Sequence, residues 1–97
     1  MSEETRLRVI VFREADNWVA HCLEYAISAQ ARDLDEVKAR FEIALHADLA
    51  ESMRRYGKPF AGIPQSPPYL HELWARGSDF RAELSVDHVR AEMAVAA

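Results

Sequence analysis

Four histidines and one cysteine are the side chains in this sequence best suited to catalysis or metal binding: His21, His46, His71, His88 and Cys22. A zinc site needs three or four converging ligands. No two of the histidines stand at the spacing of a metal-binding motif. Glu42 and His46 are four residues apart on one side of an expected helix, but such pairs are common on exposed helix faces. The pattern predicts no metal site.

The adjacent residues His21 and Cys22 have the types of an imidazole–thiolate pair. We expect both on one β-strand, where successive side chains point to opposite faces of the sheet. They therefore cannot hydrogen-bond to each other as a base and a nucleophile. A lone cysteine on a strand usually behaves as a small hydrophobic residue, so we expect Cys22 in the core. One cysteine also excludes an intramolecular disulfide.

Acidic residues near the expected strand ends are the remaining candidates for catalysis. They are Asp16, Glu24, Asp33, Asp35 and Glu36. These positions fall in turns and at the start of an expected helix, where Asp and Glu cap the chain and favour the helix dipole. The chain has three glycines and no glycine-rich phosphate loop. We expect no catalytic residue and no cofactor, and therefore a protein that is not an enzyme.

Length, charge and hydropathy narrow the class of protein further. Ninety-seven residues is the usual size of one domain, and a chain this short gains stability from forming a homo-dimer or a higher oligomer. The net charge of −4 makes DNA binding unfavourable, because nucleic-acid-binding domains carry clustered Lys and Arg. No apolar run resembles a signal peptide or a membrane span. We therefore expect a cytoplasmic location and no membrane contact.

Three strands are predicted in the first third of the chain. Residues Leu7 to Phe12 are mostly β-branched or aromatic and, apart from Arg8, apolar on both faces, which is typical of a strand inside a sheet. The polar residues Glu14 to Asn17 form a hairpin turn, after which Trp18 to Leu23 and Ile27 to Arg32 alternate as strands. Short connections between consecutive strands predict an antiparallel meander.

One long amphipathic helix follows the three strands. Asp33 is placed to cap its N-terminus, with Glu36 three residues later as in a capping box. Apolar residues then recur every three or four positions from Leu34 to Tyr56. Gly57, with Pro59 behind it, is a typical helix stop.

The remaining residues predict shorter elements. Residues 58–65 are an ordered connection, because Phe60 and Ile63 need a packing surface. Ser66 caps a short helix, Tyr69 to Trp74, and the alternating residues Phe80 to Val86 form a strand. Asp87 then caps a last helical turn, His88 to about Val95.

The fold predicted from these elements is α+β. It has an antiparallel sheet of three to four strands, one long helix packed on one face, and a short second helix. We expect a single domain, residues 1–97, with its core in residues 6–57 and an extension in residues 58–97.

The stretch Val9 to Leu49 resembles the HicB-like antitoxin family. The matching features are Val-Ile-Val-Phe ending in Glu14, the segment Asp-Asn-Trp-Val-Ala-His-Cys-Leu-Glu of residues 16–24, and the helix start Asp33 to Val37. The resemblance implies a partial RNase H-like fold without nuclease carboxylates. It further implies that the domain binds a small basic toxin, an mRNA interferase of double-stranded-RNA-binding fold, and blocks the toxin's catalytic histidine.

The chain departs from the family in two places. Leu23, Tyr25 and Arg32 stand in a region where the family usually has prolines and glycines. Many family members also carry a C-terminal ribbon-helix-helix or helix-turn-helix domain, and residues 80–97 are too few for the strand and two helices of a ribbon-helix-helix. Regulation through DNA is therefore not expected.

Two functions are consistent with these observations. The first is a partner-binding module of a toxin–antitoxin system, and the second is a self-associating structural domain of the same fold with no toxin. Contacts with a partner are expected from aromatic, histidine and acidic residues: Trp18, His21, Glu24, Tyr25, Trp74 and Phe80. A neighbouring reading frame that encodes a short Lys- and Arg-rich protein would favour the first function.

Overall fold

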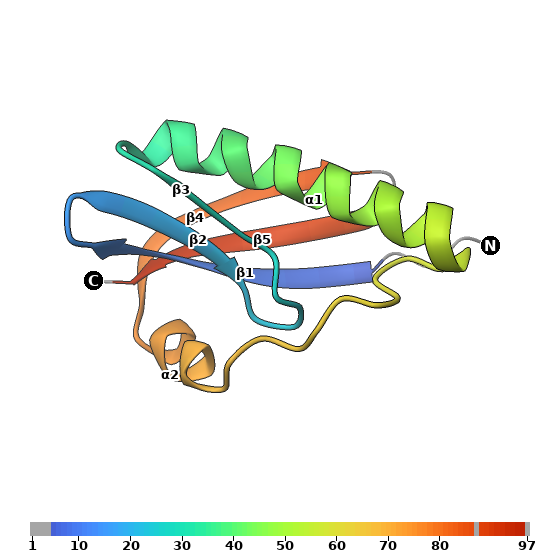
Figure 1. Ribbon diagram of the computed structural model, residues 1–97. Coiled ribbons are helices and arrows are strands. Elements are labelled where there is room, and N and C mark those ends of the chain that lie inside the picture. The colour runs from blue at the N-terminus through green and yellow to red at the C-terminus, as the bar shows by residue number, and fades with distance from the viewer. Residues whose placement is uncertain (1–4, 87, 97) are drawn as a thin grey trace.

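The computed structural model describes residues 5–86 and 88–96, apart from the side chains of residues 77–82. One five-stranded sheet lies between a long helix on one face and a short helix near the other (Figure 1). Along the chain the elements are β1 (Thr5–Glu14), β2 (Asn17–Cys22), β3 (Ser28–Ala31), α1 (Leu34–Tyr56), α2 (Tyr69–Ala75), β4 (Gly77–Val86) and β5 (Val89–Ala96). The predicted α+β class is confirmed.

The first three strands form the predicted antiparallel meander. β1 pairs with β2 from Val9–Cys22 to Glu14–Asn17, and β2 pairs with β3. β1 lies in the middle of the strand order β3-β2-β1-β5-β4. Val9 and Ile10, which point to opposite faces of the sheet, are both fully buried. The prediction of a strand inside the sheet is therefore confirmed.

Helix α1 begins and ends at the predicted residues. The Asp33 side chain accepts a hydrogen bond from the Glu36 N–H at 2.7 Å, which satisfies one of the free amides of the first turn. Gly57 ends the helix in the left-handed conformation (φ 71°), and its N–H donates to the Met53 carbonyl. On the face of the helix that packs on the sheet, the side chains of three residues are fully buried: Val37, Phe41 and Leu45.

The C-terminal third differs from the prediction. The sheet has five strands and is mixed, because β5 runs parallel to β1 and antiparallel to β4. The predicted helical turn His88–Val95 is wrong, since Val89–Ala96 is strand β5; Asp87 lies outside the described residues. Ala, Glu and Met favour a helix locally, but here the segment gains ladder hydrogen bonds from a strand on each side. This tertiary pairing outweighs the local preference.

Two apolar clusters hold the layers together. The larger one joins α1 to one face of the sheet, and strands β4 and β5 complete it with Val86, Val89, Ala91 and Met93. The smaller one joins α2 to the opposite face. Its buried members are Ile10, Leu23, Leu70 and Ala94. Residues of the C-terminal extension therefore take part in both clusters.

Helix α1 is not centred on the sheet. It packs mainly on β3 and β2 and touches β4 less. An open groove of about 280 Å³ remains between α1 and β4, where Leu84 is only half-buried. One side of the sheet is therefore better covered than the other.

Candidate functional site

Cys22 is a core residue and not an exposed nucleophile. Its side chain is fully buried in the larger apolar cluster, as predicted. Burial raises the pKa of the thiol from 9.0 to about 11, because the thiolate loses its hydration. The Glu24 carboxylate, which accepts from Sγ at 3.7 Å, acts in the same direction. A catalytic cysteine needs the opposite, a lowered pKa with access to solvent.

The histidines lie apart from one another. His46 on α1, His71 on α2 and His88 beside β5 are exposed, whereas His21 on β2 is half-buried. The His21 Nδ1 lies 2.9 Å from the Cys22 carbonyl oxygen. Among the residues that the structure describes, no group of three His, Cys, Asp or Glu side chains is arranged to hold a metal ion.

Two predicted partner-binding residues, Glu24 and Tyr25, meet in one groove. The groove has a volume of about 460 Å³ and lies between the β2–β3 connection and the chain that leads into α2. Its lining residues are Leu23, Glu24, Tyr25, Gln65, Ser66, Pro68 and His71. Glu24 is the only Asp, Glu, Lys or Arg among these lining residues. The groove therefore offers acidic, aromatic and amide groups side by side.

Hydrogen bonds between its two walls fix the width of this groove. The Ala26 N–H donates to the Pro64 carbonyl at 2.8 Å. The Ser66 hydroxyl donates to the Cys22 carbonyl at 2.6 Å. Ser66 is thus not the N-cap of α2 as predicted: Pro68 takes that position, without a side-chain cap. The site is preformed, because the connection after α1 is tied to the sheet before α2 begins.

Aromatic stacking supports the floor of the groove. The rings of Tyr25 and Phe60 stack at 4.4 Å with an angle of 6° between their planes. Phe60 is buried and has a positive φ of 65°, which is rare for a bulky residue. Such a conformation persists only when the surrounding packing determines it. The predicted ordered connection over residues 58–65 is therefore confirmed at Phe60.

The Glu24 carboxylate is held in place from the sheet. One oxygen accepts from the Arg8 backbone N–H at 2.9 Å, and the other accepts from Arg8 Nε at 2.7 Å. The two side chains keep 44% and 28% of their surface exposed, so the pair stays in contact with solvent. A carboxylate oriented in this way retains lone pairs for a further donor from a partner.

The structure places the other predicted contact residues outside this groove. Trp18 lies at the far end of β2, where the Arg13 guanidinium stacks 5.4 Å from the ring centre. His21 points to the α2 side of β2, and Trp74 packs from α2 against the smaller cluster. The side chain of Phe80 lies outside the described residues.

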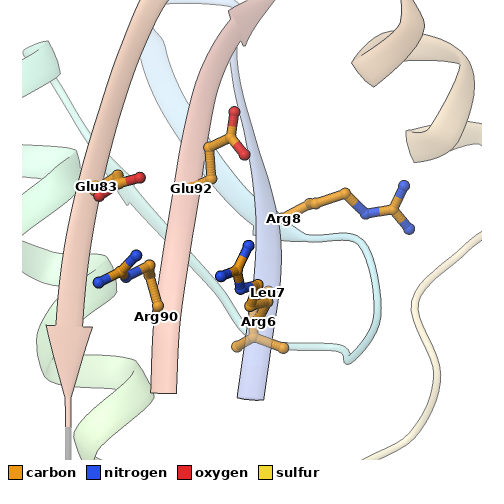
Figure 2. Close-up of a pocket in the computed structure, with 6 residues that line it drawn as sticks. All are labelled: Arg6, Leu7, Arg8, Glu83, Arg90 and Glu92. Atoms are coloured by element: carbon orange, nitrogen blue, oxygen red, sulfur yellow. The ribbon is translucent and has the colours of Figure 1, made fainter. Parts of the chain in front are cut away.

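A charged face of the sheet was not foreseen from the sequence. Figure 2 shows Arg6, Arg90, Glu92 and Glu83 on three neighbouring strands, with Arg8 extending away from β5. In the register, Arg6 lies beside Arg90 and Arg8 beside Glu92, around a hollow of about 300 Å³. The sequence signal for this face is the charge at alternate positions, Arg90 and Glu92, which indicates one face only if Val89–Ala96 is a strand.

Comparisons with known families, proteins and structures give no match for this chain. The chain matches no protein-family model, no curated protein sequence and no solved structure. Within the described residues, neither helix combines the length and the apolar character that crossing a membrane requires.

Proposed function

We propose that this chain is a protein-binding regulatory module of the HicB-like antitoxin type, which neutralises a small basic mRNA-interferase toxin in the cytoplasm. The order of three antiparallel strands followed by one long helix supports the proposal, because the resemblance of residues 9–49 implies that order. The role needs no catalytic step by this chain. Binding alone inhibits the toxin.

The groove between Glu24 and His71 is the observation that carries the proposal. Its lining includes the Glu24 carboxylate, which is already paired with Arg8 but keeps 28% of its side chain exposed to a basic segment of a partner. Tyr25 adds an aromatic face for a Lys or Arg side chain of the partner. The hydrogen bonds from Ala26 and Ser66 fix the groove before binding, so little ordering is needed when a partner enters.

The role proposed for the C-terminal residues is structural. Residues 77–86 and 89–96 form two strands of the sheet and complete its core. These residues are therefore part of the same sheet as the first three strands. We propose that regulation by this chain acts through a protein contact.

The experiment is co-purification followed by a measured affinity. The chain is co-expressed with the tagged product of the adjacent reading frame, and the complex is titrated by calorimetry. Gln65→Arg adds a positive charge to an exposed residue of the groove, and we expect the Kd to rise about tenfold through charge repulsion.

Ala47→Arg is the matched control, because it adds the same charge on an exposed part of α1. We expect it to leave the Kd within about twofold of the parent, since a rim charge far from a contact contributes little. Equal losses in both variants would remove the groove from the proposal. If the parent protein forms no complex and does not relieve toxin-induced growth arrest, the antitoxin function is wrong.

A further inference from the structure

All four prolines of the sequence lie in the connection between α1 and α2. Residues 63–67 of this connection form no helix, strand or turn (Figure 1). The proline ring fixes φ at about −65°, and each proline restricts the residue before it to extended conformations. Within residues 63–67, Gln65 alone carries no such restraint. The sequence of this segment therefore favours a polyproline II helix, which has three residues per turn.

The exposure of the side chains repeats with the same period of three. Ile63 and Ser66 are half-buried, whereas the residues between and after them are exposed: Pro64, Gln65, Pro67 and Pro68. Ile63 packs against the larger apolar cluster, and the Ser66 hydroxyl donates to the Cys22 carbonyl. The segment thus lies on the protein with one of its three edges and keeps the other two in solvent.

The two exposed edges differ in what they adjoin. Gln65 and Pro68 lie on one edge and line the groove at Glu24. Pro64 and Pro67 lie on the other edge and are not part of the groove lining. Three residues of polyproline II advance by about 9 Å, so this second edge presents two proline rings at about that spacing. We refer to it as the Pro64–Pro67 edge.

We propose that the Pro64–Pro67 edge binds a partner domain whose groove is lined by aromatic side chains and takes Pro-x-x-Pro segments. Such grooves recognise the preformed polyproline II helix and the apolar rings that it presents at this period. The stretch from Pro64 to Pro67 has this pattern, and both of its prolines are exposed. The recognition needs no charge on either side, which suits a stretch without Asp, Glu, Lys or Arg.

The Pro64–Pro67 edge is fixed in the fold before a partner binds. The Ala26 N–H donates to the Pro64 carbonyl at 2.8 Å, and the Ser66 hydroxyl donates to the Cys22 carbonyl at 2.6 Å. These bonds hold the segment against the β2–β3 connection from both ends of the Pro-x-x-Pro stretch. A segment that is already ordered loses little conformational entropy on binding. The contact is independent of the proposed toxin, because it uses a different edge of the segment from the groove.

The test is a titration of the isotope-labelled full chain with a panel of purified SH3 and WW domains, which carry aromatic grooves of this kind. We expect at least one domain to bind and to shift the amide signals of Gln65 and Ser66. Pro67→Ala should raise the Kd of that complex about tenfold, because one ring no longer enters the groove. Pro59→Ala is the matched control, since Pro59 is an exposed proline of the same connection outside the Pro-x-x-Pro stretch. It should leave the Kd within about twofold of the parent.

Competition remains decisive if Pro67→Ala alters the fold. A synthetic proline-rich peptide that occupies the aromatic groove of the same domain should displace the parent chain from the complex. The titration contains no toxin, so its outcome does not depend on the antitoxin function. Absence of binding to every domain of the panel would overturn the proposal and leave the prolines a purely structural role. A complex that the peptide does not displace, or equal losses in Pro67→Ala and Pro59→Ala, would overturn it as well.

Discussion

The two edges of this sheet show how one helix can leave a small domain with one closed side and one open side. At β3 the helix α1 lies close enough for Arg40 to donate to the outward carbonyl of Gln30. At β4 the helix is farther away and an open groove remains. The position of α1 over the sheet therefore determines which edge is protected.

The same contrast separates the two faces of the sheet. The face under α1 is closed by a continuous apolar cluster. The other face is covered by α2 around Ile10 and Ala94, and carries the charged group around Arg90 beyond it. Antiparallel and mixed sheets commonly keep one solvated region of this kind. The closed parts of the molecule provide stability, whereas the proposed contacts use the open parts.

The largest expected effect comes from removing the side chain that holds α1 on the closed side. Phe41 is fully buried between α1 and the sheet. Phe41→Ala should lower the free energy of unfolding by about 3–5 kcal/mol, because it removes apolar contacts and leaves a cavity. Urea unfolding of the parent and the variant measures this difference.

Ile43→Ala is the control on the outer face of the same helix. Ile43 keeps 68% of its surface exposed, and its removal should change the unfolding free energy by less than about 0.5 kcal/mol. Comparable losses at both positions would contradict the orientation of α1 and, with it, the difference between the two edges.

A smaller effect is expected from opening the edge of β3. Arg40→Ala removes the donor to the Gln30 carbonyl and the ion pair with Glu36. We expect a loss of about 0.5–1 kcal/mol in unfolding free energy, since the contact is exposed. We also expect new association of the protein, because the outward carbonyl of Gln30 would then be open to strand addition.

Arg54→Ala is a suitable comparison for Arg40→Ala. Arg54 is an exposed arginine in the last turn of α1 and is likewise paired with a glutamate, Glu51, whereas Arg40 also donates to a strand. It should unfold with a similar cost and show no added association by light scattering. If both variants form larger assemblies, the cause is the lost charge and not the opened edge. If neither variant forms larger assemblies, Arg40 does not protect the edge of β3.

Much of the closed half could be predicted from the sequence, because its signals are local. Asp33 and Gly57 mark the ends of α1 through hydrogen bonds within one helical turn. The alternation in β1 and the polar turn before Trp18 are likewise contained in short segments. Consecutive strands then pair with each other, so little long-range information is needed.

The open half depends on contacts between residues far apart in the sequence. β5 pairs in parallel with β1, from Thr5–Val89 to Val11–Val95, and no local signal encodes that partner. The alanines of β5 suit a central strand with packing on both faces, but alone they favour a helix. The predicted helix cap at Ser66 is wrong for the same reason: its hydroxyl donates to the carbonyl of Cys22, which is 44 residues away.

The candidate site was predictable only in part. Glu24 and Tyr25 were expected as contact residues, and the structure brings both into the groove. The opposite wall, from Gln65 to His71, joins them because Ala26 bonds to Pro64 and Tyr25 stacks on Phe60. The residue types in the sequence predict the wall that contains Glu24 and Tyr25. The second wall follows only from the fold of the connection between α1 and α2.

The smallest effect at neutral pH concerns Cys22, which tests whether the side of the sheet under α1 is closed to solvent. Burial raises the thiol pKa from 9.0 to about 11, so the folded protein binds this proton more tightly than the unfolded chain. The contribution to stability is complete below pH 9 and is lost as the pH rises through about 11. A Cys22→Ala variant should lack this alkaline component of the unfolding curve.

At neutral pH a thiol reagent should modify the parent no faster than the protein unfolds, because Sγ is inaccessible in the fold. Rapid labelling of the folded protein would mean that α1 leaves this side open as well, and the contrast between the two edges would no longer follow from the position of the helix.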